Sequence, residues 1–465
     1  MALQPEEAGR ATSVSGDEAG RGRQIRLAAV ASVIGTSIEW YDFFLYGTAA
    51  AIVFPAVFFP ASSAYAGTLE SFATYAVGFA ARPVGAAIFG HWGDRIGRKA
   101  TLIITLLMMG LASALVGVLP GTSTIGIAAP ILLVVLRVLQ GIAVGGEWSG
   151  SVLLSMEWGK QNKRGLMASW PQIGVPIGLL LGTGMMTLIA LAAPDAFKAW
   201  AWRIPFLASL VLVAIGLWVR LKVLETPLFA QLVEKRTVSK MPVLDVIRRY
   251  PKQIVLSALL RMSEQAPFYL YTAFALTYIK DDLHKSTYVG LAAVTVGGAL
   301  ELFLIPTFGH LSDRLGRRRV YTTGAIVMGI VAFPFFLLLN TAVLGFIILG
   351  TALIAIAHSM QYGPQSSYIA ENFPTGLAYA GSGLGYQAAS LIAGGPAPLL
   401  ATWMLPTFGW QAIAVYIIAC VVITLAAAAL LPDRSRTGVA EAPVLEPAGR
   451  AAGSCRRARS GLSRP

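Results

Sequence analysis

The sequence has few charged residues and few groups that bind metal ions. Charged residues make up 13% of its 465 residues, against about 25% in a soluble globular domain. It has four histidines and two cysteines, Cys420 in an apolar run and Cys455 near the C-terminus. Two such cysteines argue against a disulfide framework and against a cysteine-based metal site. We therefore expect no metal ion and no cofactor.

Sequence patterns of catalysis are also missing. The polar segments contain no nucleophile–base motif, no metal-ligand spacing and no phosphate-binding loop of the Walker type. We expect a protein that is not an enzyme and that draws its energy from an ion gradient. No short apolar stretch with a small-residue cleavage site precedes the first long one, so no cleaved signal peptide is expected.

What the sequence has in excess is apolar length. Hydrophobic residues make up 56% of the chain, and apolar runs of about 20 residues, long enough to cross a bilayer, recur throughout. Backbone in lipid must satisfy its own hydrogen bonds, so these runs predict helices. The expected fold class is an all-α membrane protein with twelve transmembrane helices. Their approximate ranges are 27–54, 69–91, 100–119, 126–154, 166–191, 202–221, 254–279, 288–309, 320–340, 343–369, 377–403 and 409–431.

The basic residues lie mostly on one side of the predicted membrane. Of the 36 Lys and Arg residues, 28 fall in the tails and in the connections on one side, whereas four fall on the other side. Lys and Arg accumulate in cytoplasmic loops, so both termini are predicted to be cytoplasmic. Topology thus accounts for the net charge of +13, and nucleic-acid binding is not expected.

One motif is repeated nearly half a chain apart. GHWGDRIGRKATL at 90–102 returns as GHLSDRLGRRRVY at 309–321, each between the second and third spans of its own six. Two six-helix halves in the same orientation are a transporter design with the substrate site between the halves. The predicted organisation is a disordered cytoplasmic tail (1–25), an N-terminal six-helix bundle (26–221), a cytoplasmic linker (222–252), a C-terminal six-helix bundle (253–432) and a disordered cytoplasmic tail (433–465).

Several motifs resemble one family of transporters. The loop Gly90–Lys99 resembles the signature loop of the major facilitator superfamily, and RVLQGIAVGGEWSGS (137–151) resembles its fourth-helix motif. IEWYDFFLYG, SWPQIGVPIGLLLG, WRIPFL…ETPLF and YIAENFPTG…GYQ look like the metabolite:proton symporter branch, which includes osmoprotectant, α-ketoglutarate, citrate and shikimate permeases. The resemblance covers about residues 26–431. It implies two pseudo-symmetric six-helix bundles in the inner membrane, and we expect a monomer.

The chain departs from the family pattern at Ala378. The resemblance implies an arginine there, near the start of the eleventh helix. The connection between the tenth and eleventh spans consequently has no Lys or Arg. This absence puts in doubt any gate contact that relies on that side chain.

Two carboxylates lie one helical turn apart in the first span. Glu39 and Asp42 are at positions i and i+3 and therefore share a helix face. Ionised side chains at the bilayer midplane normally face a cavity or a partner, and two carboxylates this close are not expected to be ionised together. The pair is thus suited to carry one proton. The alternatives are a fixed ion pair with Arg137 or Arg261, or a position nearer the lipid headgroups. By the resemblance, Arg137 takes part in proton coupling.

Arg261, in the seventh span, is the candidate for binding a substrate carboxylate, because a guanidinium can bind a carboxylate through two parallel hydrogen bonds. It lies three residues before Glu264, so the alternative is an ion pair that holds helices together. Glu301 and His358 stay ambiguous, since a lone membrane histidine is more often a hydrogen-bonded core residue than a proton relay. The other candidates for substrate contact, with packing as the alternative for the aromatic ones, are Gln265, Tyr269, Trp40, Tyr41 and Glu147.

The repeated loop predicts a cytoplasmic gate. Asp94 can cap a helix N-terminus, where the helix dipole favours an anion. Arg98 can reach Glu157 at the end of the fourth span, and the second copy offers an equivalent pair. By the resemblance this set latches the gate while the cavity faces outward, and the alternative is charge that only sets topology. The predicted gate residues are Asp94, Arg95, Arg98, Glu157, Asp313, Arg314, Arg317 and Glu371.

The function predicted from these observations is secondary active transport. We expect import of a small organic acid by proton symport through alternating access, with the lipid bilayer, protons and the substrate as partners. Choosing protons over sodium rests on the resemblance. The alternatives are proton-coupled uptake of proline or betaine, which the same branch carries, and a membrane sensor with a transporter-like body.

Overall fold

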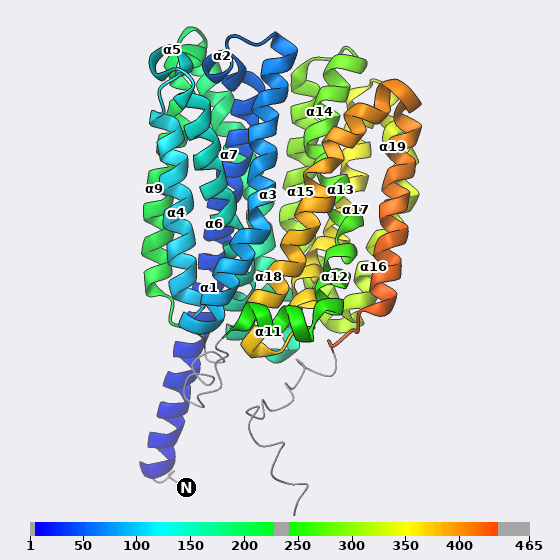
Figure 1. The fold of residues 1–465 in the computed structure, drawn as a ribbon. Helices are drawn as coiled ribbons and strands as arrows, with labels where there is room; N and C mark the ends of the chain where they lie inside the picture. Colours follow the sequence, from blue (N-terminus) through cyan, green and yellow to red (C-terminus); the bar gives the residue numbers. More distant parts are fainter. Residues whose placement is uncertain (1–4, 227–240, 436–465) are drawn as a thin grey trace, which may run out of the picture.

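The computed structural model describes residues 5–226 and 241–435, which are helical almost throughout (Figure 1). No strand occurs in these ranges, in agreement with the all-α prediction. The N-terminal half (residues 5–226) consists of α1 (Pro5–Ile52), α2 (Phe54–Phe58), α3 (Ala64–Ile96), α4 (Arg98–Val118), α5 (Thr122–Ile125), α6 (Ala128–Trp158), α7 (Arg164–Ala192), α8 (Pro194–Ala196) and α9 (Arg203–Lys222). The C-terminal half (residues 241–435) consists of α11 (Pro242–Arg249), α12 (Pro251–Leu260), α13 (Met262–Tyr269), α14 (Ala275–Thr277), α15 (Thr287–Leu315), α16 (Arg317–Asn340), α17 (Leu344–Ala370), α18 (Ala378–Ala389) and α19 (Pro396–Leu430).

Nine helical segments within the described residues are long and apolar enough to cross a membrane. The predicted span 27–54 covers the second half of α1, which begins at Pro5 and ends at Ile52, and the first residue of α2. The predicted seventh span, 254–279, is broken into α12, α13 and α14 with a π-helical turn at Leu270–Phe274. The last two predicted spans run together, with the break at Gly409, whose φ is +73°. The count of twelve spans therefore stays a prediction.

The predicted tails and linker differ from the structure in part. Helix α1 begins at Pro5, inside the segment 1–25 that was predicted to be disordered. In the predicted linker, residues 227–240 lie outside the described part, and the rest includes α11, which contacts α3 and α18. Most of the predicted C-terminal tail, residues 436–465, also lies outside the described part.

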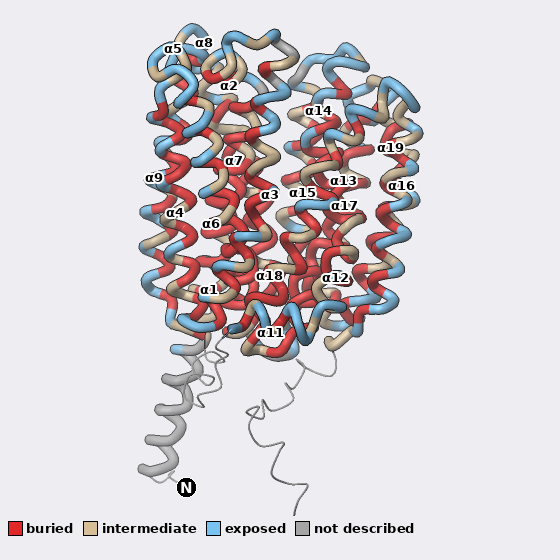
Figure 2. Tube along the Cα trace, viewed as in Figure 1, coloured by how far each residue is buried: buried red, intermediate tan, exposed pale blue. Residues whose placement is uncertain are grey.

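The outer surface of the helices is apolar, as a lipid environment requires. Leu115 of α4, Trp218 of α9 and Ile330 of α16 are exposed, and Figure 2 shows exposed positions along the outward faces of these helices. Buried polar and charged groups lie inward. The exposed apolar residues therefore mark the lipid-facing side, and the charged groups in the interior mark the positions that need a functional or structural explanation.

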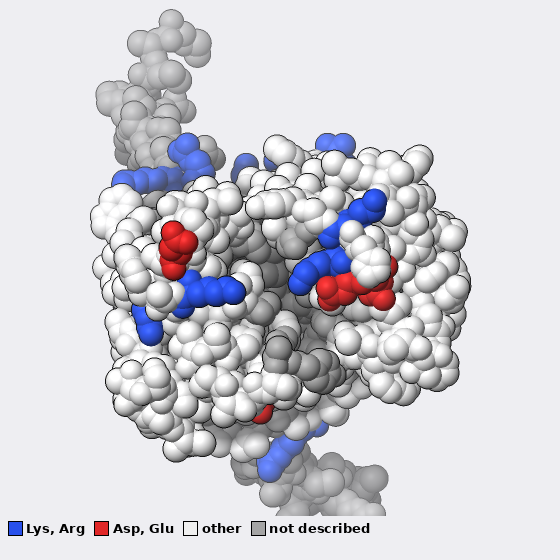
Figure 3. All heavy atoms as spheres, turned by 90° about the horizontal axis from the view of Figure 1, so that it is seen from above, with Lys and Arg blue, Asp and Glu red and all other residues white. Residues whose placement is uncertain are grey.

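The two halves meet at the end that carries both copies of the repeated motif, drawn at the bottom of Figure 1 and called the lower end. There α7 packs against α15 and α17, and α3 packs against α18. At Gly90 a methyl group would lie 2.8 Å from the Cα atom of Ala380, so only glycine permits this approach. Figure 3 shows the opposite, upper end hollowed between the halves. The molecule is thus closed at the lower end and open at the upper end.

Candidate functional site

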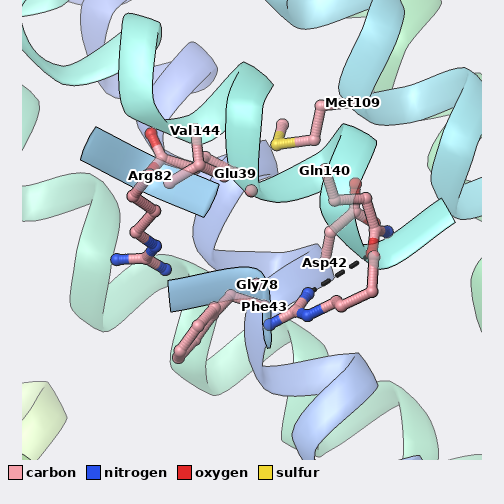
Figure 4. Close-up of a pocket in the computed structure, with 10 residues that line it drawn as sticks. Glu39, Asp42, Phe43, Gly78, Arg82, Met109, Gln140 and Val144 are labelled. Atoms are coloured by element: carbon pink, nitrogen blue, oxygen red, sulfur yellow. Dashed lines mark hydrogen bonds between the residues drawn. The ribbon is translucent and has the colours of Figure 1, made fainter. Parts of the chain in front are cut away.

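The two acids of the first span line one cavity in the N-terminal half. Glu39 and Asp42 of α1 line this cavity together with Arg82 of α3 and with Arg137 and Gln140 of α6. Figure 4 shows Glu39 on the side of Arg82 and Asp42 on the side of Gln140. Both acids are buried. The cavity has room for about one water molecule. The sequence prediction of two carboxylates on one helix face is therefore realised as a small, polar internal site.

Neither acid is held in a fixed ion pair in the part of the chain that the structure describes. Both carboxylate oxygens of Asp42 and Oε2 of Glu39 are buried without a hydrogen-bond partner there. Arg137 instead donates to Oε1 of Gln140 at 3.3 Å. The pairing with Arg137 or Arg261, which the sequence left open, is thus not seen. A buried carboxylate with no fixed partner is suited to take up and release a proton.

Aromatic rings, not carboxylates, hold the two arginines of this cavity. The guanidinium carbon of Arg137 lies 4.3 Å from the ring centre of Tyr46 and 4.8 Å from that of Tyr75. That of Arg82 lies 4.6 Å from the rings of both Phe43 and Phe79. Ring faces stabilise a cation without neutralising it. Both guanidinium groups therefore keep a positive charge with which an anion can pair.

A second pocket lies between the halves. It is lined by Trp40 and Val175 of the N-terminal half and by Arg261, Glu264, Gln265, Phe268, Tyr269, His358, Tyr362 and Tyr386 of the C-terminal half. We call this the central pocket. Three residues predicted to contact substrate besides Arg261 thus lie together there: Trp40, Gln265 and Tyr269. The predicted location of the substrate site between the halves is consistent with this geometry.

Arg261 is held in the central pocket by several contacts. Its Nε donates to Oε2 of Glu264 and to Oε1 of Gln365, each at 3.2 Å. Its Nη1 donates to the carbonyl oxygen of Tyr386, and the guanidinium carbon lies 3.3 Å from the Tyr386 ring centre. The ring of Tyr386 in turn stacks on Trp148 of α6 at 3.6 Å. Arg261 is therefore both paired with Glu264, as the alternative interpretation held, and placed at the pocket wall.

The structure places two predicted substrate contacts elsewhere. The Tyr41 hydroxyl donates to the carbonyl oxygen of Pro205 at 2.7 Å, inside the N-terminal half. Glu147 pairs with Arg220 of α9 and accepts hydrogen bonds from Thr105 at 2.8 Å and Ser151 at 3.1 Å. The sequence could not reveal the Glu147–Arg220 pair, because 73 residues separate the partners. Neither residue lines the central pocket.

We expect Glu147→Gln to lower stability, not substrate affinity. Removing one member of a buried ion pair leaves an uncompensated charge, which costs about 3–5 kcal/mol. The measurement is thermal unfolding in detergent beside substrate binding. The matched control is the double variant Glu147→Gln with Arg220→Met, which removes both charges and should recover part of the loss. An unchanged unfolding temperature with weakened binding would contradict this assignment.

The repeated motif forms two related contacts between the halves at the lower end. Asp94 accepts hydrogen bonds from the backbone N–H groups of Tyr379 at 3.3 Å and Ala380 at 3.0 Å, at the start of α18 in the other half. Asp313 likewise accepts from Gly165 at 2.8 Å and Leu166 at 3.0 Å, at the start of α7. Each aspartate thus caps a helix of the opposite half, where the helix dipole favours an anion.

Arginine pairs within each half support these caps. Arg98 donates to Glu157 at 3.3 Å, and Arg317 donates to Glu371 at 3.2 Å. Arg95 and Arg314, which were also predicted as gate residues, are both exposed, and Arg95 contacts His91. The departure at Ala378 does not remove this contact between the halves, because Asp94 binds backbone N–H groups and needs no arginine side chain there.

We expect Asp94→Asn to open the lower end more often. The variant loses at least one charge-assisted hydrogen bond between the halves, worth about 1.5–3 kcal/mol, or roughly 10- to 100-fold in the open population. The measurement is maleimide labelling of Ser149→Cys, which lies against Gly383 in the closed lower end, with Cys420 and Cys455 replaced by serine. Arg95→Gln, in the same loop, is the matched control and should label slowly. Equal labelling of the two variants would argue against the latch.

Several residues of the two pockets were missed from the sequence. Arg82 was not among the predicted site residues, although an arginine in the middle of an apolar run is itself a signal. Trp148 and Tyr386 carry no charge and gave no signal beyond membership of motifs. Their partners lie on helices distant in sequence.

Comparisons with known proteins agree with this geometry. A family model described as "Sugar (and other) transporter" matches residues 27–248, and one described as "Major Facilitator Superfamily" matches residues 254–451. The chain is 43% identical to the shikimate transporter of Escherichia coli (strain K12), over 88% of this chain and 95% of that protein. It is 33% identical to the proline/betaine transporter of the same strain, over 82% of this chain and 78% of that protein. Among solved structures, the proton:xylose symporter XylE bound to 6-bromo-6-deoxy-D-glucose matches with a TM-score of 0.73 and 17% identity, over 89% of this chain and 97% of that chain.

Proposed function

This chain belongs to the major facilitator superfamily of membrane transporters, and we propose that it imports a small organic acid together with protons by alternating access. The proposal has three parts, which are the substrate class, the coupling ion and the direction. The chain is not an enzyme, because the family and the relatives are transporters.

The observation that carries the substrate class is the presence of a buried guanidinium in each half, close to the same aromatic wall. Arg261 lines the central pocket. Arg82 lies 5.7 Å from the ring of Trp40, which also lines that pocket. Arg82 forms no ion pair with a carboxylate in the described part of the chain. A substrate carboxylate supplies that missing partner, since arginine binds carboxylates through paired hydrogen bonds.

The names of the relatives narrow the class of substrate that we propose. The shikimate transporter, at 43% identity, is named for a hydroxylated organic acid. The hydroxyl and amide groups of Tyr269, Tyr386 and Gln265 in the central pocket suit such hydroxyl groups. We therefore favour a hydroxylated monocarboxylate.

Betaine or proline uptake is the second candidate. Trp40, Phe43 and Phe268 form a cluster of rings, with centroids 5.1 Å apart for Trp40–Phe43 and 6.0 Å apart for Trp40–Phe268. Aromatic rings of this kind bind quaternary ammonium groups by cation–π interaction. A relative at 33% identity is a proline/betaine transporter.

The coupling site in this proposal is the pair Glu39 and Asp42, with Arg137 setting the local charge. The acids are buried and without fixed ion pairs, as a site that alternates between protonated and ionised forms requires. The direction follows from the predicted topology. With the basic loops at the lower end in the cytoplasm, the hollow at the upper end faces outward and receives solute from outside.

Uptake into proteoliposomes tests this function. Shikimate, α-ketoglutarate, citrate, proline and betaine are supplied one at a time, with and without an inwardly directed pH gradient. We expect shikimate to accumulate only when the gradient is present. Preferential uptake of betaine would support the second candidate, and accumulation that ignores the gradient would refute proton symport. Liposomes without protein serve as the control.

A further inference from the structure

A chain of titratable side chains crosses the interior of the C-terminal half. His358 of α17 lies between Glu264 of α13 and Glu301 of α15. Its Nδ1 is 2.7 Å from Oε1 of Glu301, and its Nε2 is 3.3 Å from Oε1 of Glu264. All three side chains are almost completely buried, with 0–2% of their surface exposed. The N-terminal coupling pair plays no part in this cluster.

The geometry of the cluster requires a bound proton. A neutral imidazole carries one N–H donor and one lone pair, and an ionised carboxylate is only an acceptor. Both imidazole nitrogens of His358 face carboxylate oxygens, so each contact needs one proton between its atoms. A neutral histidine supplies one of the two. The cluster therefore holds one additional proton, as an imidazolium or as a protonated carboxyl group.

The surroundings balance the charge of that protonated state. Arg261 is the cation that faces Glu264, and no other Lys or Arg within the described residues pairs with the cluster. When His358 is protonated, the two positive charges of Arg261 and His358 balance the two negative charges of the carboxylates. Polar and aromatic groups also face the cluster. Tyr271 donates to Glu301 at 2.6 Å, and Gln365 donates to Glu264 at 2.9 Å. The rings of Phe268 and Tyr362 stack on His358 with ring centres 4.9 Å apart.

The cluster is also connected to the central pocket. His358 and Glu264 both line that pocket, whereas Glu301 lies behind them and is completely buried. The pocket has room for about one water molecule, and a water molecule there lies against His358 and can exchange a proton with it. Because alternating access exposes the pocket to one side at a time, the same movement would expose this proton to one side at a time.

We propose that Glu264, His358 and Glu301 form a second proton-binding site, whose proton travels with the substrate anion. The inference rests on the proposed function, since it takes Arg261, together with Arg82, as a contact of that anion. A carboxylate at Arg261 adds a negative charge beside the cluster and favours the protonated form. By linkage, the proton favours binding of the anion to the same extent. In this proposal, the closed lower end and the hydrogen-bonded cluster correspond to the protonated carrier before the anion binds.

The test is the accumulation of shikimate in proteoliposomes with the membrane potential clamped at zero. A tenfold concentration ratio corresponds to about one pH unit for each coupled proton. With one proton at each site, we expect the wild type to accumulate the anion about 100-fold per pH unit. The double variant Glu301→Gln with His358→Gln replaces an imidazolium and a carboxylate by two amides. It keeps the net charge of the cluster and should accumulate about 10-fold.

Two further measurements complete the test. Ser263→Ala is the matched control, because it removes a buried hydrogen bond to Gln361 beside Glu264 and no titratable group; it should accumulate as the wild type does. If the double variant does not fold, the accumulation by the wild type decides whether the second proton-binding site exists. A wild type that accumulates shikimate only about 10-fold per pH unit would overturn the proposal. A folded double variant that matches the wild type also overturns it. No gradient-driven accumulation by any of these proteins would instead refute the proposed function.

Discussion

Replacing Arg82 with methionine is expected to remove most of the affinity for an organic acid while leaving the protein folded. Arg82 contacts aromatic rings and forms no ion pair with a carboxylate within the described residues, so its replacement breaks no ion pair in the empty carrier. Methionine keeps much of the apolar stem that packs against those rings. In the complex, by contrast, the substrate carboxylate would be buried unpaired.

Truncating one partner of a buried charged pair costs about 2–5 kcal/mol, so the dissociation constant for shikimate should rise roughly 30- to 4,000-fold. The measurement is equilibrium binding to the detergent-solubilised protein. Arg82→Lys should lose less, because it keeps the charge but not the planar pair of donors. The comparison of these two variants separates the contribution of the positive charge to shikimate affinity from that of the planar pair of donors.

Arg203→Met provides the matched control for Arg82. Arg203 also lies over an aromatic ring, at 4.4 Å from Trp202, and its Nη1 donates to backbone carbonyl groups of Gly117 and Leu119. It lies at the upper end of the N-terminal half and lines neither pocket. Its replacement should leave the shikimate affinity unchanged. An Arg82→Met protein that binds shikimate as tightly as the wild type would remove the carboxylate assignment.

Neutralising both acids of α1 should uncouple one proton from transport. Gln and Asn at positions 39 and 42 keep the shape of the side chains but cannot release a proton. The double variant Glu39→Gln with Asp42→Asn should therefore bind shikimate normally. Its accumulation ratio should fall about tenfold for each pH unit imposed across the membrane, since a tenfold ratio is worth about 1.4 kcal/mol.

The single variants show which acid carries the proton, and an exposed acid provides the control. Glu70 of α3 accepts a hydrogen bond from Ser62 at the surface, so Glu70→Gln should accumulate as the wild type does. Unchanged accumulation by the double variant would remove the N-terminal pair from the coupling mechanism. Retained uptake down a shikimate gradient would show that the loss concerns coupling and not the movement of the carrier.

The parts of this description that the sequence predicted are those that depend on local pattern. Apolar runs as long as a bilayer is thick predicted the helices, and the i, i+3 spacing predicted that Glu39 and Asp42 share one face, as they do in Figure 4. The repeated motif predicted that Asp94 caps a helix. The partner was not predictable, because it is the start of α18, 285 residues away. The same applies to Ala378, whose side chain proved not to matter for this contact.

The sequence by itself determined the class of the protein, an all-helical membrane transporter built from two related halves. Only the tertiary structure decided which charges neutralise one another. Glu147 and Arg220 pair within one half, whereas Arg82 and Arg137 rest on aromatic rings and leave Glu39 and Asp42 without fixed partners. His358 lies between two carboxylates from two other helices. The physical reason is that a helix fixes the direction of its own side chains, whereas the group that a buried charge meets is set by the packing of helices far apart in the chain.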